Sequence, residues 1–263
     1  MLRSIFAKTL FEKRVAIIVW FFASLATIVG VSMIFPPIRD TMGAMMGEVP
    51  ESMKNWFGTA ETWQTFSGYA GQEIYTQMSV LIVVVAIVFG AAFLAGDEGD
   101  GTMLTQLSRP VRRSSLYLQK YLALVVLVSA VASTYFFGAV IGGWLLGETV
   151  PYAAFFQATV MVWLLGLALS TVTYAIGAVA GRKALAGLTV GFYAFIAYFI
   201  ASLSTAADVV DKLSYSSLFR YVGSPEVMEN GLNGGHVIVF VTVIIVSLAA
   251  ALPVFASRDL RTR

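Results

Sequence analysis

The chain has 263 residues, of which 58% are hydrophobic and only 12% are charged, and its net charge is +2. This composition excludes a soluble globular domain, in which about a quarter of the residues are charged. The chain contains no cysteine, so disulfide bonds and thiolate metal sites are excluded as well. We therefore predict a membrane protein whose first partner is the lipid bilayer, with no role in nucleic-acid binding.

Six apolar segments are long enough to cross a bilayer as helices. A hydrocarbon core of about 30 Å requires about 20 residues of helix. The segments lie near residues 15–35, 77–95, 121–146, 156–180, 184–204 and 236–257. None of them alternates in polarity as a transmembrane strand would. The predicted fold is therefore all-α, with six transmembrane helices in a single domain over residues 1–263.

The basic residues predict the orientation of the chain, because loops rich in Lys and Arg stay on the cytoplasmic side. One set of loops, together with both termini, carries most of them: Arg3, Lys8, Lys13, Arg14, Arg109, Arg112, Arg113, Lys120, Arg182, Lys183, Arg258, Arg261 and Arg263. The opposite set has only Arg39, Lys54, Lys212 and Arg220. We therefore expect both termini in the cytoplasm, with the first span retained as an anchor.

The first residues favour a short helix of their own. Leu2, Ile5, Phe6 and Leu10 fall on one side of such a helix, which would lie in the inner membrane interface. The alternative is a basic anchor that only sets the topology.

The spans lack ionisable residues away from their ends, which argues against an ion-coupled carrier or an intramembrane enzyme. His236 lies at the edge of the last span, where a helix-end role is expected rather than that of a ligand or base. The phosphate-binding pattern G-x-x-x-x-G-K-[ST] is also absent. We therefore expect a non-catalytic subunit that holds no cofactor or metal, and energy for any uphill movement has to come from another polypeptide.

The polar loop 96–120 separates the second and third spans and is expected in the cytoplasm. A short helix can start at Gly101 or Thr102, with Met103, Leu104 and Leu107 on one face, and Pro110 ends it. This face fits the groove of a soluble partner, with arginines at the rim: Arg109, Arg112 and Arg113. The alternative is that the face packs on neighbouring helices or on lipid headgroups.

Two external segments, 36–76 and 205–235, are too interrupted to span the membrane. In the first segment a helix is predicted, with Pro50 in its first turn and Gly58 as its C-terminal cap. Both segments are expected to form helices in the outer interface, either as a gate or as a structural cap. Within the spans, the glycine spacings Gly138/Gly142, Gly177/Gly181 and Gly187/Gly191 permit two helices to approach closely.

The order of residues across the polar loop resembles that of permease subunits of ABC transporters of the ABC-2 type. The resemblance is carried by Glu98, Gly101, Thr102, Leu104, Leu107, Ser108, Pro110, Val111, Arg113 and Lys120. The segments Val49 to Gly58, Leu213 to Gly231 and Phe255 to Leu260 look like the same family. The chain departs from the family pattern by inserting Gly99 and Asp100, which leaves the register of the short helix open.

The resemblance implies a six-span subunit in a prokaryotic plasma membrane, paired with an identical or related permease and with two ATPase subunits that bind ATP and Mg²⁺. The short helix would then be the coupling helix. Its contacts with the ATPase would come from Glu98, Gly101, Thr102, Met103, Leu104, Leu107, Ser108, Arg109 and Arg113. A substrate cavity would be lined by the second and fifth spans, with Phe89, Phe93, Phe192 and Phe195 as candidates and core packing as their alternative role.

The favoured function is therefore that of the membrane subunit of an ATP-driven exporter for a hydrophobic or amphipathic compound such as a drug, antibiotic, peptide or lipid. Two alternatives stay open. The subunit could be an ATPase-coupled scaffold or regulator in envelope maturation or signalling, or it could be a membrane protein that works without ATP.

Overall fold

The computed structural model describes residues 4–45, 59, 61–103 and 112–258. Over these ranges the regular elements are all helices, with no strand. Among the described residues, six helices are long and apolar enough to cross a membrane: Ile5–Thr41, Phe66–Gly99, Arg113–Leu146, Tyr152–Ala180, Lys183–Ser202 and Gly234–Ser257. The predicted all-α, six-span fold is confirmed.

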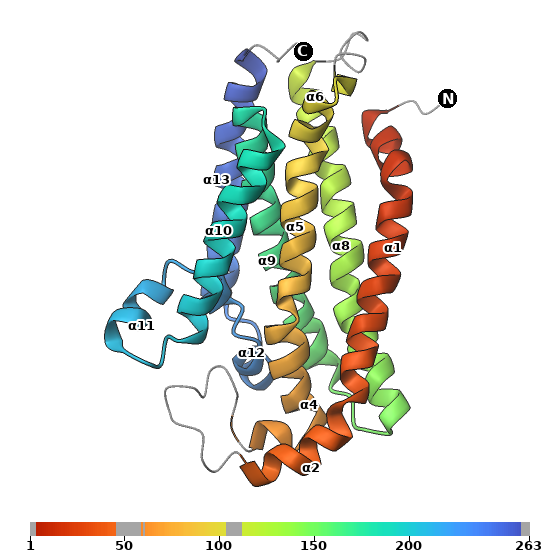
Figure 1. Cartoon of the computed structure of the whole chain (residues 1–263), viewed down its shortest axis with the longest axis vertical. Helices are drawn as coiled ribbons and strands as arrows, with labels where there is room; N and C mark the ends of the chain where they lie inside the picture. Colours follow the sequence, from red (N-terminus) through yellow and green to blue (C-terminus); the bar gives the residue numbers. More distant parts are fainter. Residues whose placement is uncertain (1–3, 46–58, 60, 104–111, 259–263) are drawn as a thin grey trace.

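The long helices run side by side, and the start of the first long helix and the end of the last one lie at the same end of the molecule, here called the terminal end (Figure 1). Helix α1 (Ile5–Met33) packs mainly on α8 (Arg113–Leu146) at one side of the bundle. Helix α9 (Tyr152–Ala180) is central and contacts α5 (Ser79–Ala91), α8, α10 (Lys183–Ser202) and α13 (Gly234–Ser257). The fold is thus organised around α9, the most buried of the spans.

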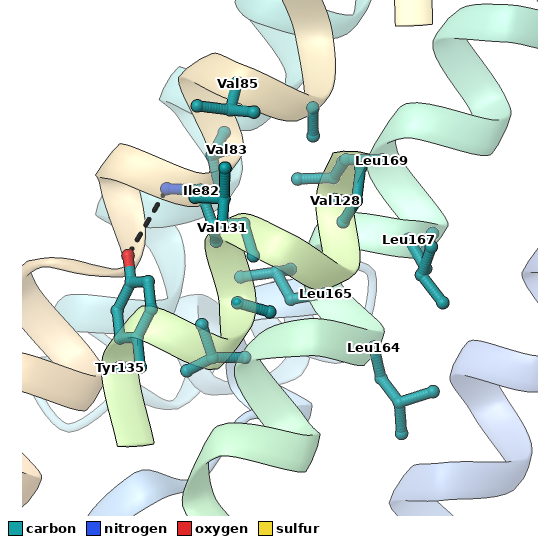
Figure 2. Packing of buried hydrophobic residues seen from close by; sticks show 14 of the residues in the cluster. Ile82, Val83, Val85, Val128, Val131, Tyr135, Leu164, Leu165, Leu167 and Leu169 are labelled. Atoms are coloured by element: carbon teal, nitrogen blue, oxygen red, sulfur yellow. Dashed lines mark hydrogen bonds between the residues drawn. The ribbon is translucent and has the colours of Figure 1, made fainter. Parts of the chain in front are cut away.

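The apolar core lies where α5, α8 and α9 meet. Figure 2 shows Ile82 and Val85 of α5 facing side chains of the other two helices, among them Val128 and Val131 of α8 and Leu165 of α9. These five side chains are fully buried. Close packing of such branched side chains holds the three helices together, because lipid tails are as apolar as the side chains themselves and packing has to supply the attraction.

Tyrosine hydroxyls tie backbone groups of neighbouring helices together. The Tyr135 hydroxyl accepts a hydrogen bond from the Ile82 N–H at 3.3 Å (Figure 2). It also donates one to the Met78 carbonyl at 2.5 Å. The Tyr174 hydroxyl donates to the Tyr117 carbonyl at 2.7 Å. A polar group without a partner in a bilayer costs several kcal/mol, so these bonds both satisfy the hydroxyls and join α8 to α5 and α9 to α8.

Two helix boundaries predicted from hydropathy were wrong. The second long helix begins at Phe66, eleven residues before the predicted start at 77, and it includes the π-helical stretches η4 (Ala70–Gln77) and η5 (Ala92–Gly96) around α5. The third begins at Arg113 and not at 121. Both helices continue past the apolar stretch into polar sequence, so part of the expected loop 96–120 is helical.

The prediction of a separate interfacial helix at the N-terminus was also wrong. Residues from Ile5 onward belong to the same continuous helix as the first span. Its first turn is capped by the Ser4 hydroxyl, which accepts a hydrogen bond from the Ala7 N–H at 3.1 Å, and the Phe6 N–H donates to the Gln119 side chain of α8 at 3.1 Å. Contact with α8 therefore keeps these residues in line with the span.

The two segments that were expected to be external contain short helices, as predicted for 205–235. Helix α11 (Asp208–Ser214), η6 (Leu218–Tyr221) and α12 (Ser224–Asn230) lie between the last two long helices, at the end of the molecule opposite the terminal end, here called the far end (Figure 1). The segment 36–76 contains most of α2 (Phe35–Met45), η3 (Glu61–Trp63) and α4 (Phe66–Tyr69). The helix predicted between Pro50 and Gly58 lies outside the described residues.

Of the three predicted glycine pairs, Gly138 and Gly142 make the closest approach, and the neighbouring helix is α1, whereas a Cβ at Gly191 would meet nothing within 4 Å. A Cβ atom added at Gly142 would lie 2.2 Å from the Ser32 Cβ, and one at Gly138 would lie 2.6 Å from a methyl group of Ile28. Both distances are shorter than van der Waals contact. Helices α1 and α8 can therefore pack at this separation only with glycine at these positions.

We expect Gly142→Ala to separate α1 from α8 and to lower the free energy of unfolding by about 1–3 kcal/mol, the range for an overpacked core. The measurement is chemical denaturation of the purified protein in detergent. Gly30→Ala is the matched control, because a Cβ at Gly30 of α1 meets nothing within 4 Å. Equal stabilities of the two variants would contradict the proposed packing role.

Candidate coupling site

The loop after the second long helix starts with two acidic residues in a defined conformation. Asp97 and Glu98 belong to α6 (Asp97–Gly99), which follows η5 directly, and Gly101 then adopts a left-handed backbone with φ of 74°. The Thr102 hydroxyl donates a hydrogen bond back to the Asp97 carbonyl at 3.1 Å. Thr102 and Met103 are helical, so the predicted short helix begins where the sequence places it.

Glu98 is paired with Arg258 at the end of α13. The side chains are 2% and 16% exposed, and one guanidinium nitrogen of Arg258 donates to the Glu98 Oε1 at 2.8 Å, while a second contacts Oε2. The Arg258 Nε also donates to the Ala178 carbonyl of α9 at 2.7 Å. The bidentate ion pair joins the start of the loop to the end of α13, and the hydrogen bond to Ala178 adds the end of α9.

Gly181 leaves room for this ion pair. It ends α9 in a left-handed conformation with φ of 61°, which glycine adopts without strain. A Cβ at this position would lie 3.0 Å from the Glu98 Oε1 and 3.0 Å from the Arg258 Nη1. Glycine therefore serves both the turn and the close approach of the two charged groups.

A second ion pair fixes the other side of the loop. The Lys120 side chain is completely buried, and its Nζ contacts the Asp97 carboxylate and donates to the Phe93 carbonyl at 3.1 Å. Because an ammonium group in the protein interior is stable only with a counter-charge and hydrogen-bond acceptors, this pair locks α8 against η5 and α6.

Arg113, the first residue of α8, completes the arrangement. Its guanidinium donates to the Arg258 carbonyl at 2.5 Å. We call Asp97, Glu98, Arg113, Lys120 and Arg258 the charge cluster. The cluster joins the described residues on either side of the loop to the ends of α8, α9 and α13.

The predicted coupling residues that the structure describes differ in exposure and in the contacts they make. Gly101 and Thr102 are exposed, and Met103 is buried in the apolar core with 1% exposure. Glu98 and Arg113 are used within the chain, in the charge cluster. The other four lie outside the described residues: Leu104, Leu107, Ser108 and Arg109. Met103, Glu98 and Arg113 are therefore placed to anchor the loop in this subunit.

The four candidate cavity phenylalanines do not surround a common space within the subunit. Phe89 is 8% exposed and Phe93 is 1% exposed; their rings contact each other, with centroids 6.2 Å apart, and Phe89 also contacts Trp20. Phe192 and Phe195 of α10 are 69% and 64% exposed. The first two are packed inside the bundle, and the other two could line a cavity only outside this subunit, as between two copies.

From the sequence, Lys120 and Arg258 were predicted only as cytoplasmic charges and members of the family pattern, and Asp97 only as part of the polar loop 96–120. The sequence did contain a relevant pattern, because acidic and basic residues lie at helix ends that the topology brings to one side of the membrane. That pattern does not predict which acidic residue pairs with which basic residue. In the part of the chain that the structure describes, no group of three or more His, Cys, Asp or Glu side chains could hold a metal ion.

A family model described as "ABC-2 family transporter protein" matches residues 6–260 of the chain. The match covers nearly the whole length, including the six long helices and the entire charge cluster. No curated protein matches the chain.

We expect Glu98→Gln to lower the free energy of unfolding by about 3 kcal/mol or more, because it leaves the Arg258 guanidinium buried without its counter-charge. Chemical denaturation in detergent measures the change. The control is Glu12→Gln in α1, whose carboxylate lies 3.6 Å from the Lys8 Nζ with both side chains more than 40% exposed. This exposed pair should contribute less than about 1 kcal/mol. An effect of Glu98→Gln no larger than that of the control would contradict the anchoring role of the pair.

Proposed function

Since the chain belongs to the ABC-2 family of transporter proteins and is a multi-pass membrane permease of an ABC transporter, we propose that it couples ATP hydrolysis in a separate subunit to the export of a hydrophobic or amphipathic compound. The observation that carries the proposal is the charge cluster beneath the polar loop. An ATPase that pushes on this loop would act on several transmembrane helices at once.

The proposed path of the movement starts at the loop residues after Gly101. From there it reaches the Glu98–Arg258 pair, and through it α13 and the Ala178 carbonyl of α9. The Asp97–Lys120 pair adds α8. Since ion pairs of this kind have a small number of discrete arrangements, they support transmission between rigid helices better than a flexible linker would.

The proposed assembly contains two ATPase subunits and a second permease, identical or related. The family supports an ATPase partner and often a second permease. ATP and Mg²⁺ would bind to the ATPase, because this sequence has no phosphate-binding loop. The permease would then supply the path and the ATPase the energy.

The proposed cargo follows from the chemistry of the spans. Their ionisable residues lie toward the helix ends, as Glu73 does at the far end and Lys120 at the terminal end, while the shared core of α5, α8 and α9 is apolar. A path formed by such helices suits a hydrophobic or amphipathic molecule better than a small ion, which requires polar ligands along its route. Export is proposed from the family resemblance of the polar loop.

The expected orientation can be measured by cysteine labelling, because the natural chain has no cysteine. Thr102→Cys places a thiol on an exposed residue at the terminal end, and Asp208→Cys places one on an exposed residue at the far end. In intact cells, a membrane-impermeant maleimide should label only Asp208→Cys, and after permeabilisation it should label both. Labelling of only Thr102→Cys in intact cells would reverse the proposed orientation.

The coupling proposal can be tested with inside-out vesicles that contain the permease and its ATPase. We expect ATP-dependent uptake of a lipophilic dye, and we expect the double substitution Leu104→Asp and Leu107→Asp to remove both this uptake and the permease-dependent part of ATP hydrolysis. The physical reason is that a carboxylate cannot enter an apolar groove without losing its hydration.

The matched control is Leu213→Asp, which changes a 52% exposed leucine in α11 at the far end. This variant should retain both activities. Hydrolysis that is insensitive to the Leu104 and Leu107 substitutions would contradict the coupling role. Coupled hydrolysis without movement of any of a panel of lipophilic compounds would favour the scaffold or regulator instead of the exporter.

A further inference from the structure

A cavity of about 800 Å³ lies at the far end of the subunit. It is formed by residues of η4, the last turn of α10, and the segment from α11 through α12, and it also includes His236 at the start of α13. We call it the far-end cavity. Its volume falls within the range of small-molecule binding sites, about 300–1,000 Å³. It is separate from the charge cluster, which lies at the terminal end.

The charged groups of the far-end cavity leave it negative. Arg220 is neutralised by Asp211, since its Nη1 lies 2.5 Å from the Asp211 carboxylate, and the guanidinium also lies over the Tyr215 ring at 3.9 Å. Partial burial acts to lower the pKa of Arg220, but the hydrogen bond and charge of Asp211 outweigh it and raise the pKa. Glu226 and Glu229 line the same cavity without an ion pair to any residue in the described ranges.

Two polar atoms at the cavity also lack hydrogen-bond partners among the described residues. They are the Oγ of Ser224, a residue that is 1% exposed, and the Nδ1 of His236. Both residues line the cavity, and His236 and Glu226 also line a smaller adjoining cavity of about 260 Å³. A buried polar atom without a partner costs about 1–3 kcal/mol, which a ligand with hydrogen-bonding groups would remove.

Aromatic side chains supply the apolar part of the lining. Tyr198, Phe219 and Tyr221 all face the cavity, and the Tyr221 ring meets the His236 ring edge to face with centroids 5.4 Å apart. Aromatic faces attract cations as well as apolar groups. Counting only partners among the described residues, the cavity therefore combines carboxylates without an ion pair, polar atoms without a hydrogen bond, and aromatic rings.

We propose that the far-end cavity binds an amphipathic small molecule that carries an amine. The ammonium group pairs with Glu226 and Glu229, the apolar part packs against the aromatic side chains, and polar groups of the ligand reach Ser224 and His236. An anionic ligand is disfavoured because Arg220, the one arginine or lysine among the described lining residues, is already paired with Asp211. This site goes beyond the proposed export function, since binding here requires neither ATP nor transport.

The test is equilibrium binding of dansylcadaverine, a fluorescent primary amine, to the full-length permease in lipid nanodiscs, with empty nanodiscs as the blank. We expect saturable binding, and we expect N-acetyl dansylcadaverine, which has no charge, to bind much more weakly. Replacing both Glu226→Gln and Glu229→Gln should weaken amine binding by about tenfold or more, the effect of losing a charge-assisted hydrogen bond.

Asp208→Asn is the matched control, because it removes one exposed carboxylate from the same end of the molecule without touching either cavity. It should leave binding unchanged. Glu226→Asp, which keeps the charge, should retain most of the affinity, and unfolding curves of all variants report their integrity. Non-saturable binding, equal binding of the acetylated probe, or equal loss in Asp208→Asn would each overturn the proposal. The binding assay does not measure ATP hydrolysis or transport. Its outcome therefore does not depend on whether the export proposal holds.

Discussion

The architecture of the terminal end depends on one constraint, which is that a buried charge has to be paired. Lys120 is completely buried in α8 and Glu98 is nearly so after η5, and each has a partner of opposite sign from another element. Removing one member of such a pair leaves an uncompensated charge in a medium of low dielectric constant. The helices that carry the partners are therefore held in a fixed relation wherever the cluster is intact.

The two ends of the subunit differ in character, and the difference suits their proposed roles. At the terminal end, opposite charges close on one another and leave a loop held firmly at both of its ends, by Glu98 before it and Arg113 after it. At the far end, the carboxylates of Glu226 and Glu229 are left unpaired among the described residues and border a polar cavity. In our proposals, the closed cluster transmits movement between the helices and the open carboxylates receive a ligand.

Hydropathy located the spans but not the ends of the helices. The helix that begins at Phe66 was missed over its first turns because Gln72, Glu73 and Gln77 are polar, although tertiary contacts keep them helical. The same applies at Arg113 to Lys120, where polar residues precede the apolar stretch of α8. A local average of hydropathy cannot register that a charge is neutralised by a residue elsewhere in the chain. The N-terminal helix was misjudged for the same reason, since contact with α8 keeps it in line with α1.

The sequence by itself determined the membrane class, the number of spans, the absence of a phosphate-binding loop and the family. These follow from composition, the length of apolar runs and the order of short motifs, all of which are local properties. Only the tertiary structure decided that Glu98 pairs with Arg258, 160 residues away, and that Phe89 and Phe93 are packed inside while Phe192 and Phe195 are exposed. It also decided that residues of η4, α10, α11 and α12 line a common cavity. Those features depend on which helix faces meet, and helix packing is set by the shapes of side chains that lie far apart in sequence.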